Sequence, residues 1–367
     1  MVGRFGQGPF ASEYPPLGVA ILDLDCTIAA ALGAAPLIVF KLSLLAFALA
    51  SAAAIAAVTR CLGAAAIFYG VTLLGTFGLG YTDVMTVPLL IVSLAATRAG
   101  WPVLAVGLLG VDGLIKWQVL LLMPFLLIHV LRIDGPARLI EALASRLFWR
   151  IVACGVVIAA LATAWFGLAT WMSLLNGLRH PFLSGNALNV PWIATFVIRL
   201  LQDASFGVGD EIHYLLRSPQ EMLPFRAVFF GMFLLVLATA ARAEKTYANL
   251  LFFMVLGVLT YGTWNTAVHE NHWFVAVVPA LLLAHETRSP AGTAIATLVA
   301  VMLNINLFVF YGLTGTQMMP RNVGIDLSLV LSALFALAWL LLFTCAVRLP
   351  RTEGRPGLRP ISANPVS

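Results

Sequence analysis

The feature that most constrains this 367-residue chain is its succession of apolar runs. The runs are about 15 to 22 residues long and carry few charges, which suits helices that cross a hydrocarbon core about 30 Å thick and not the short alternating strands of a membrane barrel. With 61% hydrophobic and 10% charged residues, a soluble globule would expose far too much apolar surface. We therefore predict an all-α, polytopic transmembrane helical bundle.

The bundle is expected to occupy residues 1–349 and to contain about eleven spans. These spans are predicted at 37–59, 62–80, 84–98, 101–118, 119–132, 151–168, 224–241, 247–264, 273–287, 291–311 and 326–347. Residues 17–33 are short for a span and carry two aspartates, so we expect a helix that lies in the outer interface, a poor first span being the alternative. A long external loop is predicted at 169–223 and a disordered cytoplasmic tail at 350–367.

The positions of Lys and Arg predict which loops face the cytoplasm. If the odd-numbered spans run from outside to inside, the inner loops receive almost all of the basic residues that flank the spans, namely Arg60, Arg98, Arg132, Arg138, Arg146, Arg150, Arg242, Lys245, Arg288, Arg348 and Arg351. This is a positive-inside pattern. It indicates a multi-pass protein of the cell membrane whose polar groups near span ends gather on the external face.

His269, Glu270 and His272 are bunched between two apolar runs. A charge at bilayer depth costs about 2.5–3.5 kcal/mol on insertion scales, so such residues at a helix end normally face a cavity or a partner. Two imidazoles three residues apart share one face of a helix. The spacing is not that of a zinc helix and no clear third ligand follows, so we favour phosphate or hydroxyl binding over a metal site. Hydrogen bonding without a function is the remaining alternative.

Other polar residues also interrupt the apolar pattern. Lys116 and Gln118 lie at the outer end of an apolar hairpin, where an ammonium suits a phosphate or simply reaches the headgroup level. Asp83 precedes another apolar run, so it is a helix cap, a ligand-binding carboxylate, or both. Glu13 and Tyr14 precede two prolines that stiffen the external segment.

The predicted external loop contains Asn186 and Asn189, followed by Trp192. Amides and aromatic rings of this kind hold sugars in many sites. Polar residues are also what any external loop contains, so both interpretations stay open.

Five short motifs, taken in order, resemble those of the GT-C superfamily of membrane glycosyltransferases. They are Tyr14-Pro-Pro-Leu17, Gly80-Tyr-Thr-Asp83, Leu114-Ile-Lys116-Trp-Gln118, Asn186-Ala-Leu-Asn189 and Val268-His-Glu270. The last is similar to a Val-His-Glu-Lys motif of glucosyltransferases that use a lipid-phosphate glucose. The resemblance implies transfer, with inversion, of a hexose or pentose from a polyprenyl-phosphate-linked donor to a hydroxyl of a glycan, lipid or protein acceptor outside the membrane.

The resemblance also implies roles for individual residues. The donor phosphate would be bound by Lys116, Gln118, His269, Glu270 and His272. The catalytic base would be Glu13 or Asp83, and the substrate would be positioned by Tyr14, Asn186 and Asn189. No cofactor is certain, assistance by a divalent cation stays open, and no nucleic acid partner is expected.

The chain departs from the family at its start. In the family, the usual catalytic Asp lies upstream of the Tyr-Pro-Pro-Leu motif, in a loop that follows an N-terminal helix, whereas thirteen residues precede Tyr14 here. Eleven spans with a cytoplasmic C-terminus also need an external N-terminus, which has no export signal before it. We therefore hypothesise an N-terminally shortened member. A transporter or lipid flippase, and a degenerate inactive relative, are the alternative classes.

Overall fold

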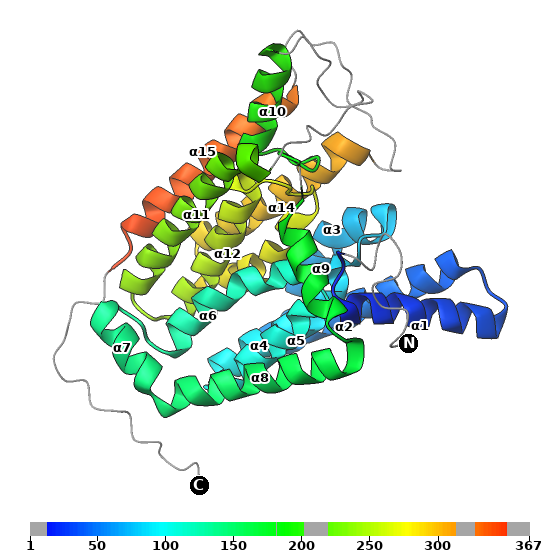
Figure 1. Cartoon of the computed structure of the whole chain (residues 1–367), viewed down its shortest axis with the longest axis horizontal. Helices are drawn as coiled ribbons and strands as arrows, with labels where there is room; N and C mark the ends of the chain where they lie inside the picture. Colours follow the sequence, from blue (N-terminus) through cyan, green and yellow to red (C-terminus); the bar gives the residue numbers. More distant parts are fainter. Residues whose placement is uncertain (1–12, 181, 202–218, 313–326, 351–367) are drawn as a thin grey trace.

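The structure is a computed structural model that describes residues 13–180, 182–201, 219–312 and 327–350. The described residues form a bundle of helices without strands, which confirms the predicted all-α class (Figure 1). In chain order the elements are α1 (Pro16–Leu32), α2 (Pro36–Thr59), α3 (Leu62–Leu73), η1 (Leu74–Leu79), η2 (Thr82–Thr86), α4 (Val87–Arg98), α5 (Pro102–Gly113), η3 (Trp117–Leu122), α6 (Met123–Val130), α7 (Pro136–Ala144), α8 (Arg146–Phe166), α9 (Ala169–Leu178), α10 (Val190–Leu201), α11 (Pro219–Arg242), α12 (Tyr247–Trp264), η4 (His272–Ala276), α13 (Val277–Thr287), α14 (Pro290–Tyr311) and α15 (Leu327–Val347).

Among the described residues, seven helices are long and apolar enough to cross a membrane. They are α2, α3 continued by η1, α8, α11, α12, α14 and α15. This number is lower than the predicted count of about eleven spans. The other four predicted spans fall on the shorter helices α4, α5, α6 and α13, because the chain breaks each of these runs near one end.

Three of these short helices begin in the same way. A 3₁₀ helix precedes each of them, η2 before α4, η3 before α6 and η4 before α13. Pro88 and Pro124 are the second residues of α4 and α6, a position where the missing N–H costs little. Asp83, Gln118 and His272 lie within these 3₁₀ helices. The breaks that shorten the predicted spans therefore place polar residues at three helix starts.

The opposite end of one of these helices carries an arginine. Helix α4 ends at Arg98, whose guanidinium lies 2.8 Å from the carboxylate of Glu286 near the end of α13. Since a helix rises about 1.5 Å per residue, Arg98 lies about 22 Å along the chain axis from Asp83. Arg98 and the polar residue before α4 thus lie at opposite ends of this helix, and the predicted side of the membrane for each end stays a prediction.

Of the two predicted segments between the start of the chain and the spans or between spans, one is helical as expected and the other has more structure than the sequence pattern indicated. Residues 17–33 form α1, which lies beside α2 (Figure 1), while its place in the membrane interface stays a prediction. The predicted loop 169–223 contains α9 and α10, a difference from the expected irregular segment. Asn189 starts α10, since its side-chain oxygen accepts the backbone N–H of Trp192 at 2.8 Å. The predicted tail, apart from Pro350, lies outside the described residues.

Helix α12 forms the centre of the bundle. Of its 18 residues, 72% are buried, whereas 11–39% of an 18-residue stretch is buried in each of the other candidate spans. It packs against α11, α13 and α15, and also against η3 and η4. A largely buried helix therefore supports the two 3₁₀ helices that carry Gln118 and His272.

Candidate functional site

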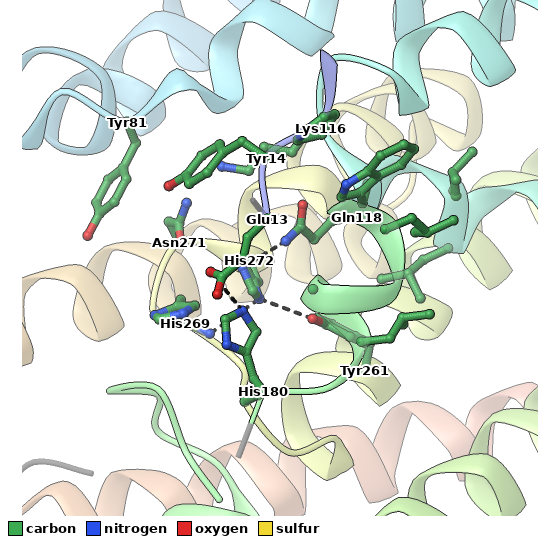
Figure 2. Close-up of a pocket in the computed structure, with 18 of the residues that line it drawn as sticks. Glu13, Tyr14, Tyr81, Lys116, Gln118, His180, Tyr261, His269, Asn271 and His272 are labelled. Carbon is green, nitrogen blue, oxygen red and sulfur yellow. Dashed lines mark hydrogen bonds and ion pairs between the residues drawn. The ribbon is translucent and has the colours of Figure 1, made fainter. Parts of the chain in front are cut away.

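A cavity of about 440 Å³ lies where the starts of α1, η3 and η4 meet the ends of α9, α12 and α14. Its wall includes Gln118 and His272, which are 154 positions apart in the sequence and in contact in the fold. Figure 2 shows these polar side chains converging from several elements. Seven of the ten predicted site residues line it: Glu13, Tyr14, Lys116, Gln118, His269, Glu270 and His272.

The segment before α1 reaches the cavity because the start of α1 is fixed against the end of α5. The backbone N–H of Leu17 donates to the carbonyl of Leu114 at 2.9 Å. Gly18 allows this close approach, since a Cβ there would lie 2.7 Å from the carbonyl oxygen of Ile115. The contact places Tyr14 beside the segment that leads into Lys116.

Lys116 and Asp83 form a buried ion pair beside the cavity. The Lys116 ammonium lies 3.1 Å from Asp83 Oδ1, and their side chains are 8% and 2% exposed. The amide of Asn271 donates to the other oxygen, Asp83 Oδ2, at 2.7 Å. Both carboxylate oxygens of Asp83 are thus engaged by neighbours. An ammonium has three N–H donors, so Lys116 keeps donors for a ligand.

The ring of His272 is held between three neighbours. The backbone N–H of His269 donates to His272 Nδ1 at 3.2 Å, and the Tyr261 hydroxyl lies 3.3 Å from the same nitrogen. The side-chain amide of Gln118 lies 3.0 Å from the other ring nitrogen (Figure 2). Burial lowers the pKa of His272 well below its ordinary value. The ring is therefore a neutral hydrogen-bonding group at pH 7.

His269 is placed by the segment that precedes α10. The backbone N–H of Gly185 donates to the carbonyl of Val268 at 2.9 Å. A Cβ at Gly185 would lie 3.0 Å from the His269 ring, so a glycine lets the two segments meet. Burial, together with the nearby His180 and Lys116, lowers the pKa of His269 to about 4. His269 is neutral at pH 7 and can act as a donor or an acceptor.

Glu270 is buried, with 2% of its surface exposed. Its Oε1 accepts the hydroxyl of Tyr81, whereas Oε2 has no hydrogen-bond partner in the described part of the chain. Its backbone carbonyl accepts the amide of Asn306 at 2.7 Å. Burial raises the pKa of Glu270 to about 7. A carboxyl group whose pKa is raised toward neutral pH therefore lines the cavity.

Glu13 occupies the rim of the cavity. Its carboxylate lies 3.3 Å from the Nε2 of His180, and the two side chains are 42% and 19% exposed (Figure 2). The backbone carbonyl of His180 accepts the guanidinium of Arg226 at 3.0 Å. The rim pair thus joins the segment before α1 to the segment after α9.

The two predicted asparagines lie outside the cavity wall. Asn186 donates to the hydroxyl of Tyr311, which does line the cavity, at 3.3 Å. Asn189 is fully buried and caps α10. Asn189 therefore acts as a helix cap in the structure, whereas Asn186 contacts Tyr311 in the cavity wall.

Several residues of the site were not predicted. They line the cavity or contact its wall and are Tyr81, His180, Tyr261, Asn271 and Tyr311. Tyr81 lies inside one of the five motifs and Asn271 lies between Glu270 and His272, and polarity within an apolar context was their available signal. Tyr261 lies within an apolar helix, and its role comes only from the tertiary contact with His272.

Metal binding has no support from side-chain clusters in the described ranges, where no group of three or more His, Cys, Asp or Glu could hold an ion. Asp83 already contacts Lys116 and Asn271, and Glu270 contacts Tyr81. The prediction that zinc is absent stays a prediction.

No protein-family model matches the chain, and no curated protein matches it. The resemblance to the GT-C superfamily therefore rests on the five short motifs. Residues from four of these motifs line one cavity, and the fifth contacts its wall through Asn186.

Proposed function

We propose that the protein is a membrane glycosyltransferase that takes a hexose or pentose from a polyprenyl-phosphate donor. The observation that carries the proposal is the convergence of Lys116, Gln118 and His269 on one cavity at the ends of apolar helices. A phosphate that leaves with extra charge needs fixed N–H donors in a site with little water. The external location of the cavity, and inversion at the anomeric carbon, belong to the same proposal.

The buried ion pair supports this assignment. Asp83 holds the Lys116 ammonium in one position, so the cation does not have to be ordered when the donor binds. Neutral imidazoles add hydrogen bonds without adding charge that would have to be desolvated. The apolar helices around the cavity suit a lipid-linked substrate, whose chain stays in the bilayer.

The test is release of lipid phosphate by the purified protein. Polyprenyl-phosphate mannose, glucose and arabinose are each supplied with candidate hydroxyl acceptors, and Lys116→Met and His269→Ala are compared with the wild type. We expect release from one donor, with a loss on the order of 10²-fold or more in both variants.

His285→Ala is the matched control, because His285 lies at the opposite end of α13 from the cavity. It should keep wild-type release. No release from any donor, combined with solute uptake in proteoliposomes, would replace the transferase by a transporter.

A further inference from the structure

The cavity contains more carboxyl groups than the binding of a phosphate needs. Glu13 and Glu270 line it, and Asp83 lies behind Lys116. An anion repels a phosphate, so Glu270 does not suit the phosphate-binding role that the motif resemblance implied. Transfer to a hydroxyl needs a group that takes the proton, so the question is which carboxyl group is free to do it.

Asp83 is not free, since one oxygen pairs with Lys116 and the other accepts from Asn271. Protonation of Asp83 would break the ion pair that holds Lys116 in the cavity. Glu13 is 42% exposed and paired with His180, so solvent competes for its proton. Neither group combines a free lone pair with a dry position.

Glu270 combines both properties. Its Oε2 is buried and has no hydrogen-bond partner among the described residues, while Tyr81 fixes Oε1. Asn306 holds the backbone of the same residue, and its own side-chain oxygen accepts the N–H of Leu188 at 2.8 Å. The residue is therefore held at its backbone carbonyl and at one carboxyl oxygen, and the other carboxyl oxygen is left over.

We propose that Glu270 is the catalytic base that accepts the proton of the acceptor hydroxyl, and that Tyr81 is its positioning residue. This inference rests on the proposed glycosyltransferase function. The acceptor oxygen forms a bond to the anomeric carbon as the bond from that carbon to the phosphate oxygen breaks. The electron pair leaves with the lipid phosphate, and the proton moves to Glu270 Oε2.

The charges around Glu270 agree with this role. Burial raises its pKa to about 7 and the nearby Asp83 acts in the same direction, whereas Tyr81, the backbone N–H of Glu270 itself and Lys116 oppose them. The neighbouring imidazoles of His269 and His272 are neutral, as their lowered pKa values require. A base whose pKa lies near the working pH is both available and strong enough to take a proton.

The first test compares Glu270→Gln with the wild type. We expect the turnover of lipid-phosphate release to fall on the order of 10²–10⁴-fold, with donor binding kept within about threefold. The wild-type pH–rate profile should have an acidic limb near pH 7, and this limb should be missing from the residual activity of the variant. Glu286→Gln, which replaces a carboxyl group at the far end of α13, should leave the turnover and the acidic limb of the pH–rate profile unchanged.

Two further measurements guard against a variant that does not fold. Tyr81→Phe removes the donor to Glu270 Oε1 and should move the acidic limb to higher pH, because the charged carboxylate loses a hydrogen bond. Infrared spectra of the wild type should show a carboxyl band that titrates near pH 7 and that is missing from the spectra of Glu270→Gln.

The failures of the two proposals are distinguishable. A wild type that releases lipid phosphate while Glu270→Gln keeps full turnover, or loses the limb only in Glu13→Gln, overturns the role of Glu270 alone. The absence of a carboxyl band that titrates near pH 7 has the same meaning. A wild type that releases nothing from any donor overturns the glycosyltransferase and this inference together.

Discussion

A carboxylate–ammonium pair and a carboxylate–imidazole pair border the same cavity and differ in their burial. The floor pair, Asp83 with Lys116, is 2% and 8% exposed, whereas the rim pair, Glu13 with His180, is 42% and 19% exposed. Their distances are similar, at 3.1 and 3.3 Å. Distance alone therefore does not distinguish them, and their surroundings do.

The two pairs are expected to stabilise the protein differently because water reaches them to different extents. Removing a charge from water costs several kcal/mol, so the floor pair is stable only while each partner stays paired, and Asn271 completes it at the second oxygen. Water screens the rim pair, which then contributes little. The floor of the cavity is thus fixed, and its rim can adapt to a substrate.

The largest expected effect comes from removing one partner of the floor pair. Lys116→Met leaves the buried Asp83 carboxylate without its cation, and we expect the free energy of unfolding to fall by about 3–5 kcal/mol. Reversible unfolding in mixed micelles measures it. Adding Asp83→Asn to the same chain should recover part of the loss. A fall below about 1 kcal/mol would mean that the floor pair is as weak as the rim pair.

Removing the second contact of Asp83 should have a smaller effect. Asn271→Ala deletes a hydrogen bond to a charged group, so we expect a loss of about 1.5–3 kcal/mol. Asn249→Ala is the control, because its amide donates to an exposed backbone carbonyl and should cost less. Equal losses in the two variants would show that the hydrogen bond to the buried Asp83 carboxylate stabilises the protein no more than an exposed one.

Glu270 and His269, which lie near the floor pair, should make stability depend on pH. The pKa of Glu270 rises from 4.5 to about 7 in the folded state through burial, so the folded protein binds this proton more tightly than the unfolded chain. The free energy of unfolding should therefore fall as the pH rises from about 4.5 to about 7. His269 acts in the opposite direction, with stability lost as the pH falls from 6.5 to about 4.

The difference between wild type and Glu270→Gln isolates the first contribution at each pH. We expect this difference curve to slope between pH 4.5 and 7 and to be level above that range. A flat curve over the whole range would show that Glu270 is not desolvated.

The smallest effect is expected at the rim. Glu13→Gln removes the charge that faces His180, and we expect a change of about 0–1 kcal/mol that shrinks further at high salt. Unfolding at two ionic strengths checks this. A loss as large as that of Lys116→Met would remove the distinction between floor and rim.

The sequence pattern predicted the helical class and much of the cavity wall for one physical reason. Polar residues such as Lys116, Gln118 and His272 lie at the ends of apolar runs, and the contrast with their apolar neighbours identifies them in the sequence. The count of spans could not be predicted in the same way. A 3₁₀ start followed by proline shortens a run without changing its hydropathy, as α4 and α6 show.

The contacts inside the cavity had no signal in the sequence. Tyr81 and Glu270 are 189 positions apart, and only the packed bundle brings them together. Asn271 lies between two titratable residues in the sequence, and its contact with the buried ion pair has no signal there. Many of the residues that line the cavity could therefore be predicted, whereas the residues that they contact depend on the tertiary structure.

The most direct test of the central claim is an experimental structure of the protein with a polyprenyl phosphate bound. The account predicts phosphate oxygens within hydrogen-bond distance, about 2.7–3.2 Å, of the Lys116 ammonium and of Gln118 or His269. The lipid chain should run from the cavity toward the bilayer. A phosphate bound elsewhere, with the Lys116 and His269 donors still facing an empty cavity, would contradict it.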